Sequence, residues 1–144
     1  MYAEDGGSWP HLGPIVTELA DRGHELSYLT SSTSDPIFDR GIVGVHPFAI
    51  GEGFRRALLF QNLDARVVVA TVPQLGLPVL PRSRNAVQNG TKYLYVFHSM
   101  ASTHMIYEAD GFDHYDVVLC VGPYMVDEIR RREALHQLPT KELI

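Results

Sequence analysis

The chain has 144 residues, of which 45% are hydrophobic and 20% are charged, an ordinary composition for one globular domain. Its net charge of −5 argues against a general nucleic-acid binder, because such proteins usually carry a basic face. The single cysteine, Cys120, excludes a disulfide framework and a cysteine-based zinc site.

Strands and helices are expected to alternate along the chain. The first helix is expected from Pro14, a residue that suits the first turn of a helix, to a stop at Gly23. A second helix is expected over Phe54 to Leu63, and a third begins at Pro123, with acidic residues early and arginines late. The segment from Val72 to Gly90 reads as a structured loop with one short helical piece.

The predicted strands are short apolar runs rich in β-branched and aromatic residues, a pattern typical of strands that are covered on both faces. In chain order they are Glu25 to Thr30, Gly44 to Ile50, Arg66 to Thr71, Tyr93 to Phe97 and Asp116 to Val121. Pro47 forbids a central position for the second of these and favours an edge.

This alternation predicts an α/β fold, a Rossmann-like, doubly wound and mostly parallel sheet with helices on both faces. The runs that begin at Tyr93 and Asp116 are expected to be neighbours inside the sheet. The chain reads as one domain over 1–144, truncated at both ends. Only Met1 to Ala3 precede the first polar turn, and no strand is expected after the last helix.

Polar clusters follow several of these strands, at the carboxyl edge where open α/β sheets bind ligands. Gly6 and Gly7 form a turn before the first helix, which is either a tight turn or an acceptor-binding loop at a helix N-terminus. His11 is a candidate for the lining of the same cleft, whereas Trp9 is expected to pack on the loop. The hydroxyl-rich run from Thr30 to Pro36 is either a helix cap through Ser34 or Asp35, or a ligand contact.

The most informative cluster follows the strand Tyr93 to Phe97. His98 would stand at the tip of that strand, and its ordinary pKa near neutrality suits a general base, although a structural histidine is the alternative. The surrounding polar residues favour the functional reading; they are Ser99, Ser102, Thr103 and His104. Gly122 opens a strand-to-helix turn whose free N–H groups could hold a phosphate.

The stretch from Tyr93 to Leu135 resembles the CDP-glycerol:poly(glycerophosphate) glycerophosphotransferase family. In that family a strand runs into a histidine motif, a second strand begins with a Tyr-Asp pair, and a small-residue turn leads into a helix. The matching pieces are His98, then Tyr115-Asp116, then Gly122-Pro123. The family's teichoic acid polymerases carry a His-Gly pair and a nearby lysine, whereas this chain has His98-Ser99 and no such lysine.

The resemblance implies the N-terminal, acceptor-side half of a GT-B transferase, with His98 as the catalytic base. Such an enzyme moves glycerophosphate, or a sugar, from a nucleotide-activated, CDP-glycerol-like donor to a hydroxyl on a cell-envelope glycan or glycolipid. The donor would bind mainly to a C-terminal domain absent from this chain, so the chain alone is expected to be inactive. No cofactor, metal or nucleic acid is expected.

The expected location is cytoplasmic, with peripheral contact at the inner face of the plasma membrane as a further option. Arginines either form solvated surface or meet an anionic lipid or acceptor; they are Arg55, Arg56, Arg82, Arg84 and Arg130 to Arg132. A non-catalytic α/β module that binds a ligand or a partner is the alternative to the enzyme.

Overall fold

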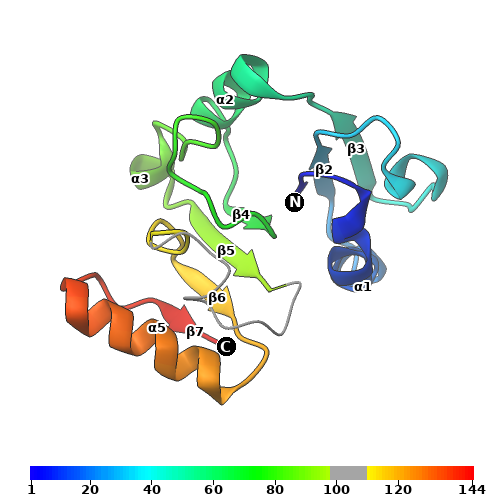
Figure 1. Cartoon of the computed structure of the whole chain (residues 1–144). Helices are drawn as coiled ribbons and strands as arrows, with labels where there is room; N and C mark the ends of the chain where they lie inside the picture. Colours follow the sequence, from blue (N-terminus) through cyan, green and yellow to red (C-terminus); the bar gives the residue numbers. More distant parts are fainter. Residues whose placement is uncertain (98–109) are drawn as a thin grey trace.

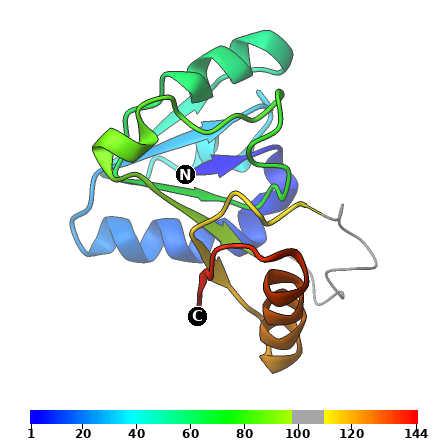
Figure 2. The same ribbon diagram turned by 90° about the vertical axis from the view of Figure 1, so that its left-hand side faces the viewer.

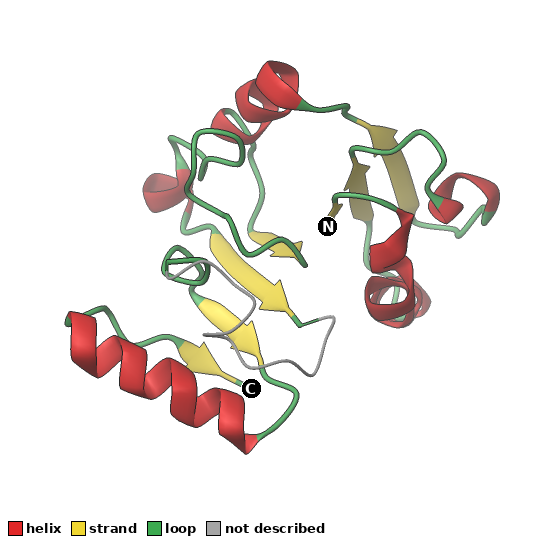
Figure 3. Ribbon diagram, viewed as in Figure 1, coloured by secondary structure: helices red, strands yellow, loops and turns green. Residues whose placement is uncertain are grey.

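The chain folds around a single parallel sheet. The computed structural model describes residues 1–97 and 110–144, and its seven strands run in the order β3-β2-β1-β4-β5-β6-β7 with every pairing parallel. Figure 1 shows this sheet with helices around it, and Figure 3 separates the strands from the loops that connect them. The expected α/β, Rossmann-like fold is confirmed.

The strands lie close to the predicted positions. They are β1 Tyr2–Ala3, β2 Leu26–Thr30, β3 Val45–Ala49, β4 Val67–Ala70, β5 Lys92–Val96, β6 Val117–Leu119 and β7 Glu142–Leu143. Strand β3, which contains Pro47, is at one edge of the sheet as expected. Strands β5 and β6 pair directly, as expected for the two apolar runs. The expectation that no strand follows the last helix is wrong, because β7 adds to β6 at the other edge.

The first helix begins earlier than predicted. A short 3-10 helix, η1 (Gly6–Ser8), leads into α1 (Trp9–Asp21), so that Pro14 lies inside the helix rather than at its start. Pro10 occupies the first turn instead, where a missing N–H costs nothing. The helix ends before Gly23, whose φ of 82° is the left-handed conformation that glycine adopts readily.

The remaining helices are close to their expected places. They are η2 Pro36–Asp39, α2 Gly53–Gln61, α3 Ala86–Asn89 and α5 Pro123–His136. Among the residues that the structure describes, no helix is both long and apolar enough to span a bilayer.

Two apolar cores cover the two faces of the sheet. Alternate residues of β1 divide between them, with Tyr2 in one core and Ala3 in the other. The Ala3 core is closed by α1, through Leu12 and Val16. The Tyr2 core is larger and more aromatic, and it is closed by α2, α3, α5 and part of the loop before α3. Figure 2 shows α1 on one side of the sheet and α2 and α3 on the other.

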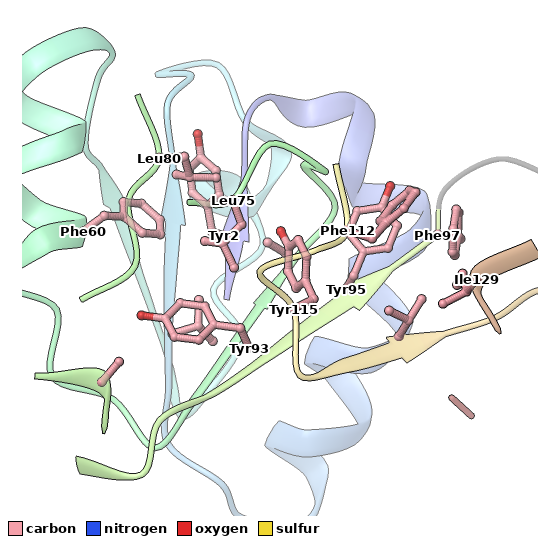
Figure 4. Packing of buried hydrophobic residues seen from close by; sticks show 14 of the residues in the cluster. Tyr2, Phe60, Leu75, Leu80, Tyr93, Tyr95, Phe97, Phe112, Tyr115 and Ile129 are labelled. Carbon is pink, nitrogen blue, oxygen red and sulfur yellow. The ribbon is translucent and has the colours of Figure 1, made fainter. Parts of the chain in front are cut away.

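Residues 72–85 form a loop that packs as part of the Tyr2 core. Leu75 and Leu80 are each 2% exposed, and Figure 4 shows them beside Tyr2. The hydroxyl of Tyr93 accepts a hydrogen bond from the N–H of Ser83 at 2.9 Å, which ties the loop to β5. The prediction of a structured loop with one short helix is therefore confirmed.

Candidate functional site

The order of the strands creates a topological switch point beside β1. Strand β1 pairs with β2 on one side and with β4 on the other, so the chain leaves these strands in opposite directions. A crevice for ligands forms at the carboxyl end of such a switch point. The loops that follow β1 and β4 meet there through a 3.0 Å hydrogen bond between the hydroxyls of Ser8 and Thr71. The switch point is thus lined by polar groups.

The Gly6-Gly7 turn follows β1 and is shaped by its neighbours. A Cβ on Gly6 would lie 2.8 Å from Cδ of Pro36, and one on Gly7 would lie 2.9 Å from Oδ1 of Asp5. The carboxylate of Asp5 accepts a hydrogen bond from the N–H of Gly7 at 2.9 Å. The chain's own carboxylate therefore occupies the N-terminal end of η1, where an anionic ligand would otherwise meet free N–H groups.

The hydroxyl-rich run after β2 is a helix cap. Asp35 is 1% exposed, and it accepts hydrogen bonds from the N–H of Ile37 at 3.0 Å and from the hydroxyl of Thr30 at 2.9 Å. It therefore caps η2, in accordance with the capping alternative, whereas Ser34 hydrogen-bonds to Ser32. The buried oxygens of this run stabilise the loop itself.

A second polar group at this edge centres on Arg56, which was expected from the sequence only as one of several arginines for solvated surface or for an anionic lipid or acceptor. The guanidinium of Arg56, on α2, donates from Nη1 to the hydroxyl of Tyr2 at 3.0 Å and to the carboxylate of Glu4 at 3.2 Å. Its Nε donates to the carbonyl of Val79 at 3.2 Å. The Tyr2 hydroxyl also lies 3.1 Å from the hydroxyl of Ser31. We call Tyr2, Glu4, Ser31 and Arg56 the Arg56 cluster.

The position of Arg56 relative to the apolar residue Phe60 on α2 is the sequence signal that could have indicated this cluster. Phe60 is fully buried, and Arg56 precedes it by one helical turn on the same side. Arg55 lies one residue away and is exposed. The side chain of Arg56 is only 11% exposed, whereas that of Glu4 is 55% exposed.

Burial and the contacts within the Arg56 cluster together set the protonation of its members. Burial raises the pKa of Tyr2, although its hydrogen bond with Ser31 and the charge of Arg56 partly offset this increase. Burial alone would lower the pKa of Arg56, but the contacts with Tyr2 and Glu4 outweigh it, and the net pKa is raised. At neutral pH the cluster therefore holds a protonated phenol and a charged guanidinium.

Trp9, at the start of α1, packs against Tyr28 of β2. Their rings meet edge to face with centroids 5.9 Å apart, and the guanidinium of Arg40 lies 4.6 Å from the centre of the Trp9 ring. Trp9 was expected to pack on its own loop, and its ring contacts are instead with Tyr28 of β2 and with Arg40. Within the described residues, the buried hydroxyl of Tyr28 has no hydrogen-bond partner. Burial raises its pKa, and the charges of Asp35 and Asp5 add to that effect.

The other expected site residues are dispersed. His11 is exposed in the first turn of α1. Gly122 precedes α5 after β6, and β4 and β5 separate that strand from β1. His98 lies outside the described residues, together with the rest of its cluster: Ser99, Ser102, Thr103 and His104.

The arginines near the opposite end of the sheet have structural partners. Arg82 forms an ion pair with Asp116 at 3.1 Å, and Arg132 forms one with Asp113 at 2.7 Å.

No family model, curated protein or solved structure matches the chain. Function is therefore inferred from the residues themselves.

Proposed function

We propose that this chain is the acceptor-side domain of a GT-B transferase. The enzyme would move glycerophosphate, or a sugar, from a nucleotide-activated donor to a hydroxyl of a cell-envelope glycan or glycolipid. The observation that carries this proposal is the switch point beside β1, where polar groups of the loops after β1, β2 and β4 gather. The doubly wound parallel sheet supports it, as does the resemblance of the stretch from Tyr93 to Leu135 to glycerophosphotransferases.

In this proposal the acceptor hydroxyl approaches the switch point. The partly exposed Ser8 provides a hydroxyl that can exchange hydrogen bonds with a polyol, since it can donate and accept, and the buried hydroxyl of Thr71 holds it in place. His98, two residues past the end of β5, is the proposed base. It takes the proton of the acceptor hydroxyl while the oxygen attacks the phosphorus or sugar carbon of the donor, and the nucleotide leaves. The donor is held by a second domain.

Acceptor binding by this chain is the first test. A short poly(glycerophosphate), titrated into the ¹⁵N-labelled chain, should shift the amide signals of Ser8 and Thr71, and Ser8→Ala should weaken binding. Ser34→Ala is the matched control, because Ser34 is an exposed hydroxyl at the same edge of the sheet. CDP-glycerol should not be turned over, because half of a two-domain cleft cannot align donor and acceptor. Turnover by the chain alone would contradict the proposal.

The proposed base has its own test. In a polypeptide that also carries the donor-binding half, His98→Ala should lower turnover by about two to four orders of magnitude. The melting temperature should stay nearly unchanged. A structural histidine predicts the reverse, a loss of about 1–3 kcal/mol in the free energy of unfolding from the partner left unpaired.

A non-catalytic ligand- or partner-binding module is the second candidate. The observation in its favour is that the first two polar loops use their own groups internally, as Asp5 caps Gly7 and Asp35 caps Ile37. It predicts that the acceptor titration leaves Ser8 and Thr71 unaffected, and that His98→Ala changes stability but not turnover.

A further inference from the structure

The Arg56 cluster contains a buried charge with an unusual set of partners. Tyr2 and Val79 are neutral, and they fix the guanidinium by hydrogen bonds of 3.0 and 3.2 Å. The anionic partner is Glu4, at 3.2 Å and with a side chain that is 55% exposed. Charge-assisted hydrogen bonds are commonly 2.7–2.9 Å long. Arg56 is therefore held by two neutral groups of the fold, and the contact with its exposed counter-ion is longer than most charge-assisted hydrogen bonds.

Arg56 has more hydrogen-bond donors than Glu4 engages. Among the contacts of the described residues, Nη2 of Arg56 meets no acceptor, and Nη1 is shared between Tyr2 and Glu4. The hydroxyls of Tyr2 and Ser31 stand next to each other at 3.1 Å. Because burial raises the pKa of Tyr2, its hydroxyl keeps its proton at neutral pH. A guanidinium and two hydroxyls thus converge on one place at the carboxyl edge of β1.

We propose that the Arg56 cluster is a binding site for a phosphate group, and that Glu4 occupies it when no ligand is bound. A phosphate has several acceptor oxygens, which can engage both Nη atoms of Arg56 and the hydroxyl of Ser31, while the fully buried hydroxyl of Tyr2 holds Arg56 and Ser31 in place. The exposed side chain of Glu4 moves into solvent as the phosphate enters. A carboxylate of the protein thereby competes with the ligand for one guanidinium.

The neighbouring helix end is not a rival site for the phosphate. The N–H of Gly7 is already hydrogen-bonded to Asp5, so the start of η1 is neutralised by the chain. The other arginines of the described ion pairs also have firm partners, with Arg132 bonded to both oxygens of Asp113 at 3.0 and 2.7 Å. Arg56 differs from Arg82, Arg130 and Arg132 in that its counter-ion is exposed, and from Arg22, whose partner Glu18 is also exposed, in that its own side chain is largely buried.

The source of the phosphate is the phosphodiester of the acceptor, and only this assignment rests on the proposed function. The site itself rests on the contacts around Arg56. Titration with inorganic phosphate therefore tests the site, and competition by a short poly(glycerophosphate), which contains phosphodiesters, tests the source. Phosphate binding without competition by poly(glycerophosphate) would overturn the source and leave the site standing.

The decisive experiment is an NMR titration of the ¹⁵N-labelled chain with inorganic phosphate at constant ionic strength. The amide signals of Glu4 and Ser31 should shift. Arg56→Gln should weaken binding by at least about tenfold, the size expected for hydrogen bonds to a charged group. Arg55→Gln removes the same charge from the exposed neighbouring position and should change affinity less than about twofold, because exposed charges act weakly in salt.

Glu4→Gln should have the opposite effect on phosphate affinity from Arg56→Gln, and it is the more informative variant. Removal of the competing carboxylate should tighten phosphate binding by about fivefold, the upper range for an exposed ion pair. The variant should fold normally, because Glu4 is exposed, so it tests the site even if Arg56→Gln unfolds. Glu52→Gln, an exposed carboxylate just before α2, is the control for lost negative charge. Unchanged or weaker binding in Glu4→Gln, or equal gains in both variants, would overturn the proposal.

Discussion

Removal of the Asp35 side chain should destabilise the fold substantially. Asp35→Ala deletes the cap on Ile37, a loss of about 0.5–2 kcal/mol. It also leaves the Thr30 hydroxyl, which is fully buried, without its acceptor, at about 1–3 kcal/mol. The free energy of unfolding should therefore fall by about 2–4 kcal/mol, and the melting temperature by about 5–15 °C for a chain of this size.

Urea unfolding followed by circular dichroism measures this change. Asp39→Ala is the matched control, because Asp39 is an exposed carboxylate in the same short helix, and it should change the free energy by less than about 0.5 kcal/mol. In a double-mutant cycle, Thr30→Val combined with Asp35→Ala should cost less than the sum of the single changes. Equal losses for Asp35→Ala and Asp39→Ala, or an additive cycle, would refute the reasoning.

Three further changes probe other parts of the fold. Tyr28→Phe should raise the free energy of unfolding by about 1 kcal/mol, since it removes a buried hydroxyl that has no partner within the described residues; a loss in urea unfolding would contradict this. Cys120 should react with iodoacetamide at neutral pH more slowly than free cysteine, because burial raises its pKa; an equal rate would argue against burial. Gly76→Ala should cost more than Gly23→Ala in the same unfolding assay, because both φ values are positive but only the first added Cβ would strike His114, at 2.2 Å. Equal losses in the free energy of unfolding would show that the His114 ring moves aside without a penalty.

The sheet could be predicted from the sequence wherever strands are covered on both faces. The runs that became β4, β5 and β6 are apolar at consecutive positions because each face of the sheet has its own core. Strand β7 gave no such signal, since its two residues are Glu142 and Leu143. The segment that leads into β7 is held by a side chain of α5, because the carboxylate of Glu133 accepts a hydrogen bond from the N–H of Lys141 at 2.9 Å.

The start of α1 was misplaced because two prolines compete for the same role. Pro14 satisfies the rule for a first helical turn, but Pro10 satisfies it too and is the one that does so in the structure. Local sequence does not decide between them. The preceding turn does, since Asp5 caps η1 and the chain enters α1 directly from it.

The candidate site was predictable in its position and not in its composition. The carboxyl edge follows from the order of strands and helices, and the Gly6-Gly7 turn lies there as expected. The Arg56 cluster required knowledge of contacts between residues up to 54 positions apart. Arg55 and Arg56 are identical letters in the sequence, and only the packing of α2 distinguishes them.

The brevity of β1 has a consequence for the dynamics of the chain. This strand has two residues, and its register with β4 consists of Tyr2 opposite Ala70 alone. The ladders on either side are longer, with five residue pairs between β2 and β3 and four between β4 and β5. Amide hydrogen exchange should therefore detect two separately protected units, β2-β3 and β4 to β6, joined by a weakly protected boundary. That boundary ends at the switch point, so a ligand bound there would slow exchange on both sides of it.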